Sequence, residues 1–170
     1  PTQGRELARR LRGPATLLVG LVYVQILLGA VMRHLGAGLA IPDFPLVFGG
    51  LVPPRFDPAI TIHYAHRLGA LAVTLVVVWV AVRAARSSIL VRSLAVPVGA
   101  LVALVSVQVL LGGTVIWTGR AVLPNTLHVG VGAALLATSL VLALTSRRSA
   151  VAAVEARAVD VPHGAAAAAS

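Results

Sequence analysis

The segment AITIHYAHRLGALAVTLVVVWVAV, residues 59–82, decides the fold class of this chain, because Arg67 is its only Arg, Lys, Asp or Glu residue. An α-helix rises about 1.5 Å per residue, so a segment of this length crosses the roughly 30 Å hydrocarbon core of a bilayer. The segment therefore predicts a membrane-spanning helix. Two histidines, His63 and His66, lie near the end at which the arginine interrupts the apolar pattern.

Three further apolar segments have similar length and character. We expect them to form helices over residues 14–33, 93–117 and 121–146, which together with 59–82 predict an all-α, integral membrane four-helix bundle. The composition agrees, because 58% of the residues are hydrophobic, the mean hydropathy is +0.95 and only 11% are charged. A soluble domain carries about 25% charged residues, so this class is excluded. The absence of cysteine excludes disulfides and thiolate-bound metals.

The arginines predict the orientation of the bundle, because they cluster at the ends of the apolar segments and the net charge is +9. Cytoplasmic loops are the arginine-rich ones, so the loop 34–58 is expected outside and both termini in the cytoplasm. Residues 1–13 are predicted to be an Arg-rich cytoplasmic linker, residues 14–148 the helical domain, and the low-complexity residues 149–170 a disordered tail. Nucleic-acid binding is excluded, since the basic residues flank spans and form no stripe.

The sequence contains an internal repeat. VQILLGAV (24–31) in the first segment resembles VQVLLGGT (107–114) in the third, and HRLGA (66–70) in the second resembles HVGVGA (128–133) in the fourth. Two helix pairs of one design predict a pseudo-two-fold axis along the membrane normal. Chance recurrence of Leu, Val, Gly and Ala is the alternative, which the matching Gln and His positions disfavour. Gln25 and Gln108 are predicted to join helices by hydrogen bonds.

The repeat gives one histidine to each pair at the same depth, because His66 and His128 each lie seven residues past the start of their segment. Ionisable groups inside a membrane span are costly and mark functional sites. Two imidazoles at one depth on parallel helices can bind a heme iron from opposite faces. The alternatives are a hydrogen bond from each histidine to a neighbouring helix, or a zinc site, which lacks an acidic or cysteine ligand nearby.

Four more polar residues lie near the outer mouth. His63 shares a helix face with His66 and is interpreted as a proton relay or as an interfacial residue that reaches water, with iron ligation as a third possibility. Arg67 and Arg33 are expected to bind the propionates of a heme, because arginine forks suit carboxylates. For Arg33 the alternative is interfacial snorkelling. His34 is assigned to the same mouth as a cofactor-binding candidate.

Together these residues resemble the heme A synthase family of respiratory membranes over nearly all of residues 14–148. The most specific motifs are QILLGAVMRHLGAGLAIPDFPL, HYAHRLGAL and NTLHVGVGAALLATSLVL. That family oxidises a methyl group of heme O to the formyl group of heme A, the cofactor of terminal oxidases. The resemblance implies that His66 and His128 are heme ligands. It also implies heme b as cofactor, heme O or heme A as substrate or product, and the cytoplasmic membrane of a prokaryote as location.

The chain departs from the family pattern at two places. Ile41 and Val47 stand where the outer loop often carries a cysteine pair, and His63 stands where the substrate-holding half carries a glutamate. Members usually consist of two homologous four-helix halves, so this chain looks like the C-terminal, cofactor-holding half. Its first residue is Pro rather than Met, so we expect a trimmed or excised piece. The resemblance implies a homologous half, a second copy or heme O synthase as partners. The alternative function is that of a non-catalytic bis-histidine cytochrome.

The loop between the first two helices is predicted to cover the heme. GAGLAIPDFPLVFGG (36–50) combines turn-forming glycines and prolines with Leu39, Phe44, Leu46 and Phe48. These apolar side chains predict a lid over the outer helix ends. Asp43 is expected to cap a local turn or to pair with Arg33 or Arg55.

Overall fold

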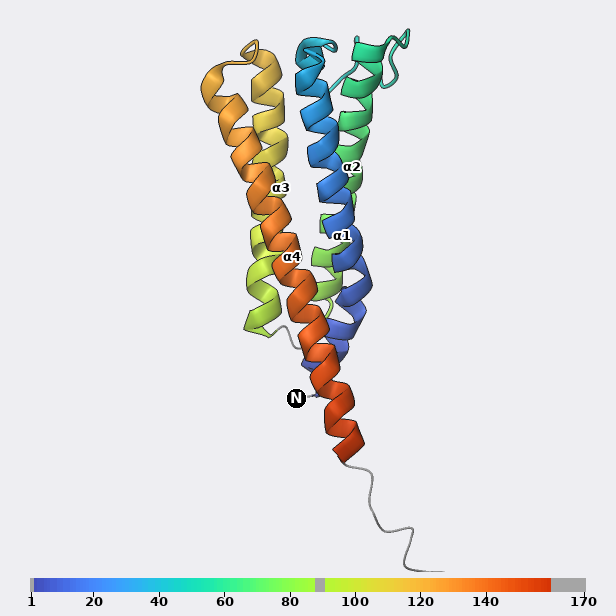
Figure 1. Cartoon of the computed structure of the whole chain (residues 1–170), viewed down its shortest axis with the longest axis vertical. Helices are drawn as coiled ribbons and strands as arrows, with labels where there is room; N and C mark the ends of the chain where they lie inside the picture. Colours follow the sequence, from blue (N-terminus) through green and yellow to red (C-terminus); the bar gives the residue numbers. More distant parts are fainter. Residues whose placement is uncertain (1, 88–90, 160–170) are drawn as a thin grey trace, which may run out of the picture.

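The computed structural model describes residues 2–87 and 91–159, and it consists of four long helices and one short 3₁₀ helix (Figure 1). The elements are α1 (Thr2–His34), η1 (Ala37–Leu39), α2 (Pro58–Ala85), α3 (Arg92–Trp117) and α4 (Val122–Val159). The predicted all-α class is confirmed. Each long helix contains a segment long and apolar enough to cross a membrane, so the chain is a multi-pass membrane protein.

Local chemistry sets the helix ends at the side of the 34–58 loop, which we call the loop end. Asp57 caps α2, because its side chain accepts a 2.9 Å hydrogen bond from the Ile60 N–H, and Pro58 follows at the first helical position. Gly36 after α1 and Gly119 after α3 have φ of 66° and 59°. Glycine adopts this left-handed conformation without steric cost, so both helices end there.

Two predictions about the termini need correction. Residues 1–13 were expected to form a linker, but α1 begins at Thr2 and runs through them without a break. Residues 149–170 were expected to be disordered, but α4 continues to Val159. Residues 149–159 are rich in alanine, which has the highest helix propensity, so low complexity does not prevent a helix there. His163 and the rest of residues 160–170 lie outside the described part.

The helices form two hairpins, α1–α2 and α3–α4, that match the two sequence repeats (Figure 1). α4 packs along both α1 and α3, and α1 packs along α2. Figure 1 shows that the hairpins diverge toward the loop end and converge toward the opposite end, which carries the N-terminus and which we call the terminal end.

The apolar core fills the terminal half of the bundle. Its fully buried members include Leu11, Leu18, Val77, Leu101 and Leu142, and Val22, Val73, Val105 and Leu135 lie at its upper limit. Closer to the loop end, the described parts of the four long helices fully bury only Ile60, His63, Gly113 and Gly132. The loop half is thus lined by small and polar groups, and the repeated Gln and His residues begin where the core ends.

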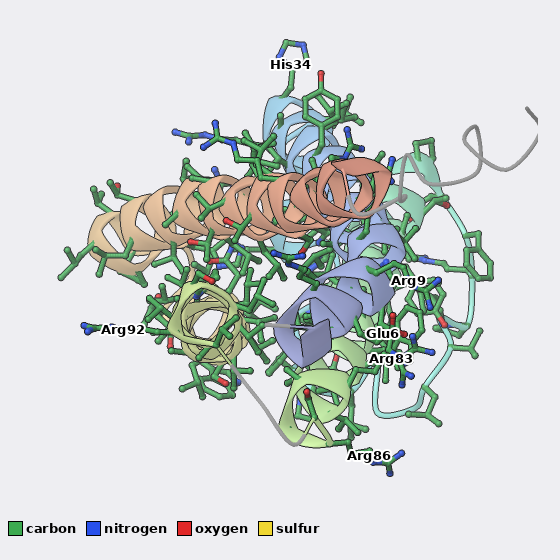
Figure 2. All side chains as sticks on the ribbon, turned by 90° about the horizontal axis from the view of Figure 1, so that it is seen from below. Glu6, Arg9, His34, Arg83, Arg86 and Arg92 are labelled. Carbon is green, nitrogen blue, oxygen red and sulfur yellow. The ribbon has the colours of Figure 1, made fainter. Side chains whose placement is uncertain are left out.

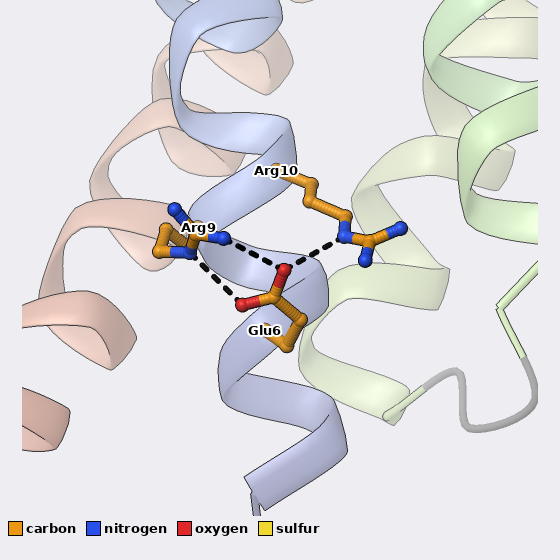
Figure 3. A network of polar contacts seen from close by, with 3 residues as sticks. All are labelled: Glu6, Arg9 and Arg10. Carbon is orange, nitrogen blue, oxygen red and sulfur yellow. Dashed lines mark hydrogen bonds and ion pairs between the residues drawn. The ribbon is translucent and has the colours of Figure 1, made fainter.

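Arginine side chains surround the terminal end. Arg83, Arg86 and Arg92 extend outward there, as the view along the bundle shows (Figure 2). Glu6 is paired with Arg9 at 2.9 Å and Arg10 at 2.8 Å (Figure 3). Glu6 occupies the first turns of α1, so its carboxylate offsets only part of the positive charge at this end.

Candidate functional site

The first half of the site joins α1 to α2 through Gln25 and His66. The Gln25 side-chain amide nitrogen lies 3.1 Å from His66 Nδ1 and donates to the His66 backbone carbonyl at 2.8 Å. Two glycines make this approach possible. A Cβ at Gly29 would lie 3.0 Å from the ring carbon Cε1 of His66, and a Cβ at Gly69 would overlap the Gln25 Oε1 atom. One glycine therefore makes room for the ring and the other for the amide.

The second half repeats these contacts between α3 and α4. The Gln108 amide nitrogen lies 3.3 Å from His128 Nε2. A Cβ at Gly112 would lie 3.3 Å from His128 Cε1, and a Cβ at Gly132 would lie 3.2 Å from the Gln108 amide nitrogen. One glutamine, one histidine and two glycines meet in each hairpin, so the sequence repeat is a repeat of contacts. We call each set a Gln–His module.

The two modules meet at their histidines. The ring centroids of His66 and His128 are 6.5 Å apart, with 62° between the ring planes. Both rings are half-buried. The structure therefore brings together the two histidines that the sequence placed at one depth. The glycines that face the rings are Gly29 and Gly112, whereas Gly69 and Gly132 lie against the glutamines.

The site fits an iron held between the rings. Bonds of about 2 Å from each imidazole to a metal place two ring centres roughly 6 Å apart, close to the observed 6.5 Å. Four buried side-chain polar atoms in the described residues lack a partner, and three belong to the modules: Gln25 Oε1, Gln108 Oε1 and His128 Nδ1. Such an atom costs about 1–3 kcal/mol. The described residues contain no group of three or more His, Cys, Asp or Glu side chains for a bare metal ion, so two histidines suit an iron that a porphyrin already coordinates.

His63 lies under the loop. Its side chain is only 3% exposed, so the interpretation as an interfacial residue that reaches water is wrong. The Ile41 N–H points at His63 Nδ1 at 3.2 Å, and the Arg67 Nε–H points at His63 Nε2 at 3.3 Å. A neutral imidazole has one lone-pair nitrogen, so it accepts only one of these hydrogen bonds.

Arg67 holds the loop against α2. Its guanidinium donates to the backbone carbonyls of Leu46 at 2.7 Å, Asp43 at 2.6 Å and Ile41 at 3.2 Å, and it lies over the Phe44 ring at 5.8 Å. These contacts direct Arg67 to the loop rather than to a propionate. The sequence could not predict this arrangement, because backbone carbonyls carry no sequence signal.

Phe44 is the part of the loop that reaches across the bundle. Its ring meets Trp117 edge-on at 5.8 Å, and a Cβ at Gly113 would lie 2.9 Å from it. The loop therefore runs from α2 to the end of α3, as a lid requires. The other three predicted lid residues are at least 39% exposed: Leu39, Leu46 and Phe48.

Asp43 caps the turn inside the loop. Its carboxylate accepts hydrogen bonds from the Gly49 N–H at 2.7 Å and the Phe48 N–H at 2.8 Å. The hydrogen bond from Gly49 is the main reason that the pKa of Asp43 lies below its usual value. Of the predicted roles, turn capping is confirmed. Arg33 and His34 are exposed at the loop end, and their side chains make no hydrogen bond or ion pair with another described residue.

The fold and the site define a class of protein: a multi-pass helical membrane protein with duplicated hairpins and a histidine pair between them. Residues 1–140 match the cytochrome oxidase assembly protein family, and the chain belongs to that family.

Similar curated proteins carry one name, heme A synthase. Those of Caulobacter sp. (strain K31) and Caulobacter vibrioides are 35% and 34% identical, each over 81% of this chain and 43% of their own length. That of Symbiobacterium thermophilum is 51% identical over 55 residues, 32% of this chain and 18% of its own. The chain thus spans less than half the length of these relatives. No solved structure matches it.

Proposed function

We propose that this chain is the heme-binding half of a heme A synthase-like oxidoreductase, with the iron of heme b held between His66 and His128. The observation that carries the proposal is the meeting of two Gln–His modules at a ring separation of 6.5 Å inside a membrane bundle. The name of the relatives supports oxidation of a heme O methyl group to the formyl group of heme A as the reaction. Bound heme would supply the redox chemistry.

The chain's own residues have separate tasks in this proposal. His66 and His128 hold the iron, and Gln25 and Gln108 orient the rings. The loop that Arg67 fixes on α2 excludes water from the loop half of the bundle, with Phe44 reaching α3. Buried His63 is the candidate proton relay, because the ring nitrogen that accepts a hydrogen bond can take up a proton instead.

A second candidate function is a non-catalytic bis-histidine cytochrome that passes electrons. The observation that favours it is that both carboxylates at the loop end are engaged in hydrogen bonds. Asp43 accepts from two N–H groups of its own loop, and Asp57 caps α2. No described carboxylate at this end is left to act as a base, and His63 stands where the family's substrate-holding half has its glutamate.

The partners and the orientation belong to the proposal as well. Because the chain spans less than half of its relatives, a homologous four-helix half or a second copy would complete the protein, and heme O synthase would supply the substrate. An apolar groove of about 480 Å³ between α2 and α3, lined by Val78, Val102 and Leu110 among others, offers a surface for such a half. The arginines at the terminal end support cytoplasmic termini in a prokaryotic plasma membrane (Figure 2).

The test is the absorption spectrum of the purified chain, oxidised and reduced, with pyridine extraction to identify the heme. We expect a low-spin bis-histidine spectrum that His66→Ala and His128→Ala both abolish. His34→Ala tests the other exposed candidate at this end, and an unchanged spectrum would remove His34 from the cofactor-binding residues. A heme spectrum that survives both site substitutions would sink the ligand assignment. Extracted heme A would support turnover, and heme b alone the cytochrome.

A further inference from the structure

Two arginines converge on a small cavity at the loop end. Arg33 at the end of α1 and Arg120 in the α3–α4 turn line a space of about 50 Å³, together with Met32, Gly38, Val115 and Asn125. The cavity exceeds the volume of about 30 Å³ that one water molecule occupies in the liquid, so a carboxylate group fits and a macrocycle does not.

Neither guanidinium has a partner among the described residues. The Arg33 and Arg120 side chains make no hydrogen bond or ion pair there, although both residues form backbone hydrogen bonds. The two carboxylates of the loop end are engaged elsewhere, because Asp43 binds the N–H groups of Phe48 and Gly49 and Asp57 caps α2. Two like charges therefore share one cavity without a counter-ion from the described residues, which makes it attractive to an anion.

The α3–α4 turn holds Arg120 at this place despite a backbone cost. Arg120 has φ of 69°, a left-handed conformation that disfavours every residue with a Cβ atom. Its side chain lies over η1, since a Cβ at Gly38 would lie 3.6 Å from Arg120 Cδ. Arg120 is thus kept in a turn where glycine would be less strained, and the aliphatic part of its side chain packs toward the cavity.

The cavity lies one helical turn beyond the histidine pair. Arg33 follows Gly29 by four residues on α1, and Asn125 precedes His128 by three residues on α4. One turn rises about 5.4 Å, so these side chains share helix faces with the groups that contact the rings. A planar ligand held between His66 and His128 would have its acidic side groups within reach of this cavity.

We infer that Arg33, Arg120 and Asn125 form an anion site for the carboxylates of the group bound at His66 and His128. This inference rests on the proposed function and names the part of the site that recognises acidic side groups. In this inference Arg120 rather than Arg67 acts together with Arg33, because the Arg67 guanidinium donates its hydrogen bonds to the loop.

The test compares two ligands, iron protoporphyrin IX and its dimethyl ester, which lacks both carboxylate charges. Each is titrated into the full chain in a neutral detergent and followed by absorbance. We expect the wild type to bind the acid about threefold to tenfold more tightly for each carboxylate recognised, since exposed charge pairs are individually weak. Arg33→Gln and Arg120→Gly should each reduce this preference, and the double variant should abolish it.

The variants are chosen to separate binding from folding. Arg120→Gly removes the cation and relieves the left-handed backbone, so lost preference cannot be assigned to a strained turn. Arg86→Gln is the matched control, because Arg86 is an exposed arginine at the terminal end and should keep the wild-type preference.

Three outcomes would overturn the inference. Equal binding of acid and ester by the wild type would end it while leaving ligation by His66 and His128 intact. If neither ligand bound, the proposed function would fail with it. Lipid phosphate is the other possible anion. After extraction from membranes that contain phosphatidylglycerol, more co-purified phosphatidylglycerol with the wild type than with the double variant, without an acid preference, would assign the arginines to lipid.

Discussion

At the scale of single residues, the site depends on which side chain stands next to each imidazole. A metal-binding histidine usually has its second ring nitrogen held by a hydrogen-bond partner, which fixes the ring's orientation. In the proposed heme site Gln25 and Gln108 would have that task, because the Gln25 amide nitrogen lies 3.1 Å from Nδ1 and 3.4 Å from Nε2 of His66, and the Gln108 amide nitrogen lies 3.3 Å from Nε2 of His128. Each glutamine comes from the helix that faces the histidine, so one amide both orients a ring and ties a hairpin together.

Replacing these glutamines should weaken heme binding more than it weakens the fold. Gln25→Leu and Gln108→Leu remove the amide contact to the ring and also remove a buried oxygen that has no partner. We expect heme affinity to fall about tenfold for each, the low end of the range for partners of metal ligands. Absorbance titration measures the affinity and circular dichroism the helix content. Thr114→Val is the control, and unchanged affinity in both glutamine variants would refute the orienting role.

The glycines that face the rings give a second prediction. Gly29→Ala and Gly112→Ala would place a Cβ at 3.0 Å and 3.3 Å from a ring carbon, closer than ordinary van der Waals contact. The ring must therefore shift, and we expect loss of low-spin ligation in the heme-loaded spectrum. Gly130→Ala is the matched control, since it lies two residues from His128 and a Cβ there meets nothing within 4 Å. Identical spectra for all three variants would contradict the packing described above.

At the scale of elements, α2 carries both the site and its cover. One face of its first turns supplies His63 and Arg67 to the loop, and His66 to the module. Asp57 fixes the start of the helix and hence the register of all three residues. Side chains of α2 therefore attach the loop to that helix. Phe44 attaches the loop to α3.

Removing the Arg67 guanidinium should release this loop. Arg67→Leu eliminates the three hydrogen bonds to loop carbonyls, and we expect amide hydrogen exchange in residues 41–50 to accelerate about tenfold or more. Arg55→Leu is the control, because Arg55 is exposed and its ion pair with Asp57 is 3.9 Å long. Mass spectrometry of peptides from this loop measures both rates. Unaltered protection in Arg67→Leu would mean that other contacts hold the loop.

At the scale of the whole molecule, stability and function occupy different halves of the bundle. The terminal half holds the buried apolar cluster, and the loop half holds the modules, the loop and the arginine cavity. Large exposed side chains such as Leu75 and Leu110 cover the outside, where lipid chains would surround them. A tight apolar half allows the other half to be lined with small and polar groups.

This division predicts where substitutions cost stability. Leu101→Ala in the core should destabilise the bundle by about 2 kcal/mol, the low end for large-to-small core substitutions, because in a bilayer only packing drives helix association. Leu110→Ala, on the same helix but 64% exposed, should change stability little. Unfolding in mixed micelles with sodium dodecyl sulfate, followed by circular dichroism, measures both. Equal losses of stability in the two variants would mean that the stabilising packing does not lie in the buried core.

Much of this protein follows from its sequence. Apolar segments free of Lys, Asp and Glu must satisfy their backbone groups internally in lipid, so four helices and their approximate ends are predictable. The repeat identified Gln25, Gln108, His66 and His128, because equal spacing gives equal depth whatever the packing. Composition failed at both ends, where residues 2–13 are part of α1 and alanine-rich residues 149–159 continue α4.

Only the tertiary structure decided what each polar group contacts. Arg67 and Arg120 are both arginines near one mouth, yet one binds loop carbonyls and the other lines a cavity with Arg33. His63 is buried under the loop although it lies within two turns of the start of α2. Such assignments depend on the path of the 35–57 loop and on helix rotation. Hydrophobic periodicity constrains these weakly in lipid, because every helix face there is apolar.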